Sequence, residues 1–246
     1  MVKPLKKLGQ HFLRNKRALT EFAKYVCGSS RALEIGVGYG TITFALNDCV
    51  GYIVGIEIDP RLIPHLQNLQ LQANIDVVLG DAINPPVRLD AFDIVYGAIP
   101  YNITGPLLSI LAKWCGGKVI LLIQKEVAQR LAASPGSNEY GRITVLVSAC
   151  YDVKLGGVYG PKSFVPPPKV YSRFVILEPK RKIDRKLLEC LEHITQCLFS
   201  GRRKLAKKMI KKCFEFEMDL GDKRVYELPL EVFLEIARKI CTSDKV

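Results

Sequence analysis

The stretch Arg31-Ala-Leu-Glu-Ile-Gly-Val-Gly-Tyr-Gly40 decides the fold, because it runs from a β-type segment into a turn with three glycines. Residues 41–46 follow at once and are expected to continue as a helix. Glycines at such a turn let the backbone come close to a ligand, and the start of the next helix then faces that ligand. The stretch therefore predicts a strand, a ligand-facing turn and a helix in succession.

Four more segments have the composition of buried strands and are separated by helical or turn-forming sequence. Strands that are apolar on both faces and alternate with helices indicate a parallel sheet covered on both sides. We therefore expect a doubly wound, Rossmann-like α/β sheet. Its further strands are expected at 52–58, 75–79, 91–96 and 118–123, and a helix at roughly 61–72.

Beyond residue 180 the sequence reads as helices only, over 186–200, 202–214 and 230–240. We expect two domains, a large α/β domain over 1–179 and a small helical domain over 180–246.

Polar or special residues stand at the carboxyl ends of four predicted strands, where ligands bind in such sheets. Glu57 could accept hydrogen bonds from two ribose hydroxyls, and Asp81 could accept one from an adenine amino group. Asp81 could equally be a turn residue. The spacing of Gly36, Gly38 and Glu57 serves NAD as well as S-adenosylmethionine, so both cofactors remain open on these residues alone.

Tyr101 directly follows Pro100 at the end of the fourth strand. An aromatic ring at the lip of a sheet is well placed to stack on a flat base. The alternative is a tyrosine packed into a tight turn.

The composition favours a polyanionic partner, since the 246 residues carry a formal net charge of +12. The first seventeen residues hold six Lys and Arg without an acid, and residues 199–212 hold seven without an acid. Either segment could be a solvated surface, but two of them flanking an α/β core fit phosphate contacts. The expected RNA-binding residues are Arg202, Arg203, Lys204, Lys207, Lys208 and Lys211.

The eight cysteines form no C-x-x-C pair and have no zinc-finger spacing, so no metal site is expected. Most lie in apolar sequence, and we expect reduced thiols in a cytoplasmic protein, proteins of hyperthermophiles being the exception to that rule. We expect no signal peptide, because the first residues contain no apolar stretch that could serve as one, and no apolar run approaches a membrane-spanning length. We expect a monomer without a membrane partner.

Several motifs in this order resemble the ribosomal RNA adenine N6,N6-dimethyltransferase family, over nearly the whole chain. The motifs are Gly9-Gln-His-Phe-Leu13, Glu34-Ile-Gly-Val-Gly38, Gly55-Ile-Glu-Ile-Asp59, Gly80-Asp-Ala82, Ile99-Pro-Tyr-Asn102, Phe164-Val-Pro-Pro-Pro-Lys-Val-Tyr-Ser172, Phe199-Ser-Gly-Arg-Arg-Lys-Leu205 and Leu228-Pro-Leu-Glu-Val-Phe233.

The resemblance implies a class I methyltransferase sheet that binds S-adenosyl-L-methionine, followed in the chain by a helical RNA-binding domain. Glu57 would hold the cofactor ribose and Asp81 its adenine amino group, while Gln10 would belong to a segment that closes over the cofactor. The implied cofactor-binding residues are Gln10, His11, Leu13, Glu34, Gly36, Gly38, Glu57, Ile58, Asp81, Ala82 and Ala98. The implied catalytic residues are Ala98, Ile99, Pro100, Tyr101 and Phe164, with the two rings sandwiching the target adenine.

Two positions depart from the family pattern, which normally has Asn where this chain has Ala98 and more usually Asn where it has His11. The missing amide oxygen is an expected acceptor for the N6 hydrogens of the target adenine. The carbonyl of Ile99 or Pro100, or the nearby Asn102, is expected to serve in its place.

The resemblance implies N6-methylation, and dimethylation, of adjacent adenines in small-subunit ribosomal RNA or in an assembling small subunit. Ala98 motivates a first alternative, a ribosome-assembly factor with weak or no catalysis. A large-subunit rRNA adenine methyltransferase is the second alternative, and an NAD oxidoreductase is the most distant.

Overall fold

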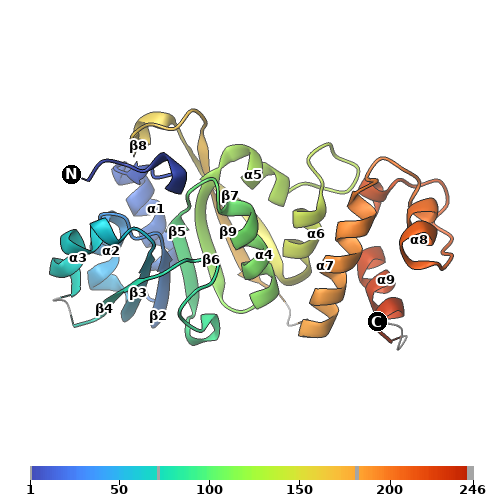
Figure 1. Ribbon diagram of the computed structural model, residues 1–246, viewed down its shortest axis with the longest axis horizontal. Helices are drawn as coiled ribbons and strands as arrows, with labels where there is room; N and C mark the ends of the chain where they lie inside the picture. Colours follow the sequence, from blue (N-terminus) through green and yellow to red (C-terminus); the bar gives the residue numbers. More distant parts are fainter. Residues whose placement is uncertain (1, 71–72, 181–182, 243–246) are drawn as a thin grey trace.

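The computed structural model describes residues 2–70, 73–180 and 183–242. A seven-stranded sheet lies at its centre, in the order β4-β3-β2-β5-β6-β9-β7 (Figure 1). The first five of these strands are parallel, and β9 and β7 are antiparallel additions at one edge. The strands span Arg31–Ile35 (β2), Tyr52–Glu57 (β3), Ile75–Leu79 (β4), Ile94–Ala98 (β5), Lys118–Gln124 (β6), Tyr151–Tyr159 (β7) and Ser172–Pro179 (β9).

Successive residues of the central strands point into different cores, as the pleat of a β-strand requires. Ala32 and Ile120 face a core formed with α1 (Lys16–Val26) and α2 (Thr41–Leu46). Their neighbours Leu33 and Leu121 face a second core. That core is formed with α4 (Thr104–Trp114), α5 (Lys125–Leu131) and α6 (Arg142–Cys150). The expected doubly wound α/β fold is confirmed.

Most predicted boundaries agree with the structure, and one strand is displaced. The strand expected at 91–96 begins at Ile94, because Leu89–Ala91 form a short 3₁₀ turn. It continues to Ala98 because its ladder with β6 extends to the pair Ala98–Leu122. The helix expected at 61–72 comprises a 3₁₀ turn, Pro60–Leu62, and α3, Ile63–Gln70. Its last two residues lie outside the described ones.

Three helices follow β9: α7 (Arg185–Phe199), α8 (Ala206–Phe214) and α9 (Leu230–Thr242). Leu188 and Leu191 of α7 share a buried core with Val147 of α6, so the helices pack directly on the α/β part. In Figure 1 they form the end of the molecule opposite the N-terminus. Within the described residues, no helix combines the length and the apolar character needed to cross a bilayer.

The helix expected from Arg202 begins only at Ala206, which corrects that boundary. Residues 201–205 are instead a turn tied to the segment before α9. The N–H of Tyr226 donates to the carbonyl of Arg202, and the N–H of Val225 donates to that of Lys204.

The N-terminal segment crosses the carboxyl ends of the parallel strands. Its short strand β1 (Phe12–Leu13) pairs antiparallel with β8 (Phe164–Val165), with Leu13 opposite Phe164. The N–H of Arg14 donates to the carbonyl of Ser163, and the amide of Asn15 donates to the Ser163 hydroxyl. Residues more than 140 positions apart are thus joined at the edge where ligands bind.

The expectation of reduced thiols is wrong, because all eight cysteines are paired in disulfides. The pairs are Cys27–Cys49, Cys115–Cys150, Cys190–Cys241 and Cys197–Cys213. Partners lie 16 to 51 residues apart in the chain, while their Cα atoms lie 4.9 to 6.5 Å apart. Only the fold brings them together, so the spacing in the sequence gave no signal of it.

Candidate active site

A cavity lies beyond the carboxyl ends of β2, β3, β4 and β5 and is roofed by the N-terminal segment. Ten of the residues expected at the active site line it together, namely Gln10, His11, Gly36, Gly38, Glu57, Ile58, Asp81, Ala82, Ala98 and Pro100. Leu8, Phe12, Ile35, Ile56, Gly80, Asn102 and Ile103 complete the lining. We refer to this space as the carboxylate cavity, since Glu57 and Asp81 both face it.

The glycine turn adopts backbone angles that other residues rarely take. Gly36, Gly38 and Gly40 have φ values of 74°, 61° and 76°. The N–H of Gly38 donates to Oε2 of Glu57 at 2.8 Å. The turn and the carboxylate, nineteen residues apart in the chain, therefore hold each other in place.

Glu57 combines burial with a small set of hydrogen bonds. It is 5% exposed, and its Oε1 accepts the N–H of Asp59 at 2.9 Å. Burial raises the pKa of Glu57 above its usual range, while the backbone N–H groups that it accepts oppose that shift. Each carboxylate oxygen has two lone pairs, so both can still accept a hydroxyl from a ligand in the cavity.

Asp59 fixes the roof of the carboxylate cavity and was not among the expected site residues. Its carboxylate accepts hydrogen bonds from the guanidinium of Arg61 at 2.6 and 2.9 Å and from the amide of Gln10 at 2.8 Å. The bonds from Arg61 hold the pKa of Asp59 well below its usual range. The other end of the Gln10 amide accepts the N–H of Leu5 at 2.7 Å. A buried anion thereby ties the N-terminal segment to the end of β3.

Asp81 is a turn residue and also lines the carboxylate cavity. Its Oδ1 accepts the N–H of Ile83 at 2.9 Å, as in a turn. The side chain also faces the cavity, next to Ile58, which is 45% exposed and presents an apolar surface there.

Leu13 and Glu34 do not line the carboxylate cavity, contrary to expectation. Leu13 is buried in the ladder with Phe164. Glu34 points into the core, where its Oε2 accepts the hydroxyls of Thr43 at 2.7 Å and Tyr96 at 2.9 Å. Burial raises the pKa of Glu34 to about 7. Glu34 therefore links β2 to α2 and β5 within the core.

A second, smaller cavity adjoins the first and contains all five expected catalytic residues. Its lining consists of Gly9, His11, Ala98, Ile99, Pro100, Tyr101, Leu122 and Phe164. We call it the aromatic cavity. His11, Ala98 and Pro100 line both cavities, so these residues form the junction between them.

Tyr101 and Phe164 are held differently. Phe164 is 5% exposed and fixed by the ladder with β1. The hydroxyl of Tyr101 lies 2.8 Å from that of Ser172, the buried first residue of β9. The motif that ends at Ser172 does not by itself indicate this contact with Tyr101.

Of the acceptors expected to replace the missing amide, the Pro100 carbonyl is already bonded and Asn102 lies outside the aromatic cavity. The carbonyl of Pro100 accepts the N–H of Ile103 and the hydroxyl of Thr104, both at 3.2 Å. The amide of Asn102 donates to the carbonyl of Lys7 at 3.3 Å, and Asn102 is not part of the aromatic cavity. The carbonyl of Ile99 is the third expected acceptor, and its role stays a prediction.

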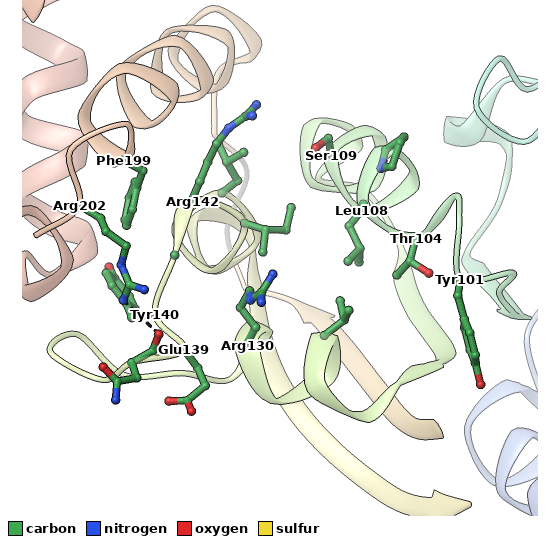
Figure 2. A pocket seen from close by; sticks show the side chains of 17 residues that line it. Tyr101, Thr104, Leu108, Ser109, Arg130, Glu139, Tyr140, Arg142, Phe199 and Arg202 are labelled. Atoms are coloured by element: carbon green, nitrogen blue, oxygen red, sulfur yellow. Dashed lines mark hydrogen bonds between the residues drawn. The ribbon is translucent and has the colours of Figure 1, made fainter. Parts of the chain in front are cut away.

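A groove runs from Tyr101 towards the C-terminal helices. Figure 2 shows Tyr101 at one end, Phe199 and Arg202 at the other, and Arg130 and Arg142 between them. The guanidinium of Arg202 donates to the carbonyl of Asn138 at 3.1 Å. The groove thus connects the aromatic cavity with the basic segment.

The expected RNA-binding residues differ in how they are paired. Lys207 forms an ion pair with Asp222, and Lys211 forms one with Glu217. Acids from the residues that follow thus pair with a segment that has none of its own. Arg203, Lys204 and Lys208 are exposed and have no acidic partner in the described part of the chain.

The strand order, the helices on both faces and the cavity at the carboxyl ends define a class I, Rossmann-like methyltransferase fold. The solved dimethyladenosine transferase from Plasmodium falciparum has a TM-score of 0.81 and 26% identity, over 94% of this chain and 98% of that one. The solved 23S rRNA methyltransferase ErmE has a TM-score of 0.67 and 23% identity, over 93% and 98% of the two chains, and shares the fold.

The chain belongs to the ribosomal RNA adenine dimethylase family, whose profile matches residues 2–226. It is 38% identical over 230 residues to the probable ribosomal RNA small subunit methyltransferase A of Pyrobaculum islandicum, covering 94% of this chain and 93% of that protein. It is 31% identical over 253 residues to the protein of that name from Thermococcus sibiricus, covering 96% and 91%. The family membership that the motifs implied is confirmed.

Proposed function

We propose that this protein transfers methyl groups from S-adenosyl-L-methionine to N6 of adjacent adenines in small-subunit ribosomal RNA, two to each adenine. The observation that carries the proposal is the junction of His11, Ala98 and Pro100 between the carboxylate cavity and the aromatic cavity. A donor in one cavity and a base in the other would meet there. Holding both reactants in place is most of what such a transfer requires.

The carboxylate cavity has the groups that this cofactor needs. Glu57 would accept the ribose hydroxyls and Asp81 the adenine amino group, while Ile58 and Ala82 would pack on the adenine ring. The glycine turn would admit the backbone close to the rest of the molecule. The bound cofactor supplies an electrophilic methyl on a sulfonium, and the protein orients it.

The aromatic cavity would take the target adenine between Tyr101 and Phe164. A base must leave its stack to enter such a cavity, at a cost of a few kcal/mol, and stacking on aromatic rings offsets part of that cost. With one ring bonded through its hydroxyl and the other buried, the platform is formed before the base arrives.

The groove of Figure 2 would carry the RNA strand, with 1–179 as the cofactor-binding domain and 180–246 as the RNA-binding domain. Arg203, Lys204 and Lys208 are free to neutralise phosphates, and Arg202, Lys207 and Lys211 would add to them. These contacts would position the RNA, and the aromatic cavity would select the base.

The deciding experiment supplies methyl-labelled cofactor and assembling small subunits or their RNA to the full-length protein, then maps the label by mass spectrometry. We expect two adjacent dimethylated adenines in the small-subunit RNA. Label in large-subunit RNA would identify the enzyme as the second alternative. Binding of the subunit without any label would identify the assembly factor, the reading that Ala98 favours.

A further inference from the structure

The aromatic cavity contains few polar side chains. Of its eight lining residues, only His11 and Tyr101 have one, and the Tyr101 hydroxyl is already bonded to Ser172. An adenine N6 in this cavity has two N–H bonds to satisfy. Its lone pair is delocalised into the ring, and acceptors that hold these hydrogens release the lone pair for reaction.

The hydrogen bonding of His11 fixes which ring nitrogen can accept. Nδ1 lies 2.7 Å from the carbonyl oxygen of Pro166. A carbonyl can only accept, so Nδ1 carries the hydrogen. In the neutral imidazole Nε2 is then an acceptor, and it has no hydrogen bond within residues 2–70, 73–180 and 183–242. The ring centroids of His11 and Tyr101 are 5.7 Å apart, which places the imidazole beside the proposed base platform.

We propose that Nε2 of His11 accepts one N6–H of the target adenine and then takes the proton that N6 loses. The inference rests on the proposed function. Methylation replaces an N–H bond of N6 by an N–CH₃ bond, so one proton must leave for each methyl added. Nε2 accepts that proton, and the resulting imidazolium returns it to solvent. The carbonyl of Ile99 is the second acceptor, and His11 supplies what the side chain of Ala98 cannot.

The first test compares His11→Asn in two backgrounds. An Asn here keeps a side-chain N–H that can reach the Pro166 carbonyl but has no acceptor at the position of Nε2. We expect H11N to lower the initial methylation rate at least about tenfold. Ala98→Asn puts an amide oxygen at the same junction, so H11N/A98N should recover to within about threefold of the unmodified protein. Unfolding temperatures of all variants check that they fold.

The second test needs no turnover. The chain has three histidines, so ¹⁵N spectra of the rings can be assigned with H65N and H193N. Without cofactor, His11 should have a protonated Nδ1 and a bare Nε2. Addition of an oligonucleotide with one unpaired adenine should shift Nε2 of His11, and the ring nitrogens of His193, an exposed residue of α7, should stay unchanged.

The outcomes separate this inference from the proposed function. If the unmodified protein methylates no adenine, the proposed function is wrong. An active protein whose H11N variant keeps its rate, or whose loss A98N does not recover, overturns the role of His11 alone. A protonated Nε2, or one that the oligonucleotide does not shift, overturns it as well.

Discussion

The hydroxyl of Tyr101 lies 2.8 Å from the hydroxyl of Ser172, which joins the end of β5 to the start of β9. Ser172 is fully buried, so its position is fixed by the sheet. The ring that is proposed to face the target base is therefore oriented by the antiparallel edge of the sheet.

Replacing Ser172 by Ala should leave the Tyr101 ring in place but free to rotate. A neutral hydrogen bond contributes about 1 kcal/mol, so we expect the methylation rate to fall about fivefold and the free energy of unfolding to fall by about the same energy. Steady-state kinetics and thermal unfolding measure the two effects. Ser29→Ala, which removes a hydroxyl bonded to the carbonyl of Val26, is the control. Equal rates in S172A and S29A would contradict the orienting role.

Glu57→Gln should weaken cofactor binding without unfolding the protein. The substitution removes the charge from the bonds that the ribose hydroxyls are proposed to donate to Glu57, and bonds to charged groups contribute about 1.5–3 kcal/mol. The dissociation constant of S-adenosyl-L-methionine should rise about 10- to 100-fold by calorimetry. Asp48→Asn, at an exposed acid away from the cavity, should leave it unchanged. An unaltered constant in E57Q would remove Glu57 from the binding site.

The buried Glu34 predicts a stability that depends on pH. Its pKa is about 7 in the folded protein, above the usual value of 4.5, so folding opposes its ionisation. Stability from this group is complete below pH 4.5 and is lost as the pH rises to 7, by about 3 kcal/mol.

Glu34→Gln retains an oxygen for Thr43 and Tyr96 but does not ionise. The stability difference between E34Q and the unmodified protein should therefore grow by about 3 kcal/mol in favour of E34Q between pH 4.5 and 8. Denaturant unfolding at both pH values measures this difference. A constant difference would mean that Glu34 titrates normally.

The disulfide between Cys197 and Cys213 should stabilise the helical C-terminal part. It links α7 to α8 across 16 residues, and closing a loop of that length is worth about 3 kcal/mol. The double variant C197S/C213S should unfold roughly 6–12 °C lower. The measurement is thermal unfolding. Reaction of Cys197 or Cys213 with a thiol reagent in the folded, non-reduced protein would show that this disulfide is absent in solution.

The basic segment should contribute unequally to RNA binding. Lys208 has no acidic partner in the described part of the chain, whereas Lys211 is paired with Glu217. Lys208→Ala should lower the slope of log affinity against log salt by about 1, and Lys211→Ala should lower it less. Filter binding at several salt concentrations measures both slopes. Equal slopes for the two variants would indicate that the ion pair with Glu217 does not reduce the contribution of Lys211 to RNA binding.

The parts of the fold that repeat a local pattern could be predicted from the sequence. The strand Arg31–Ile35 and the helix Thr41–Leu46 follow from apolar runs and a glycine turn, and both have the expected bounds. The antiparallel strand β7 (Tyr151–Tyr159) could not be predicted in this way, because it contains Gly156, Gly157 and a bulge. Glu21, 136 residues away, accepts the N–H of Gly157 and completes it.

The features of the candidate site likewise fall into those that a local motif predicts and those that it does not. Glu57, Asp81, Tyr101 and Phe164 stand in motifs, and the structure gathers them around two adjoining cavities. The contacts of Asp59 with Gln10, and the pairing of the cysteines, depend on distances between remote segments, which no local pattern encodes.

The ladder between Phe12–Leu13 and Phe164–Val165 has a consequence for the order of events. The strand that roofs the cofactor side is hydrogen-bonded to the strand that carries one of the two rings on the base side. Lifting the roof to admit a donor would therefore pull that ring away from Tyr101. Under the proposed function, we therefore expect the donor to enter before the two rings enclose the purine.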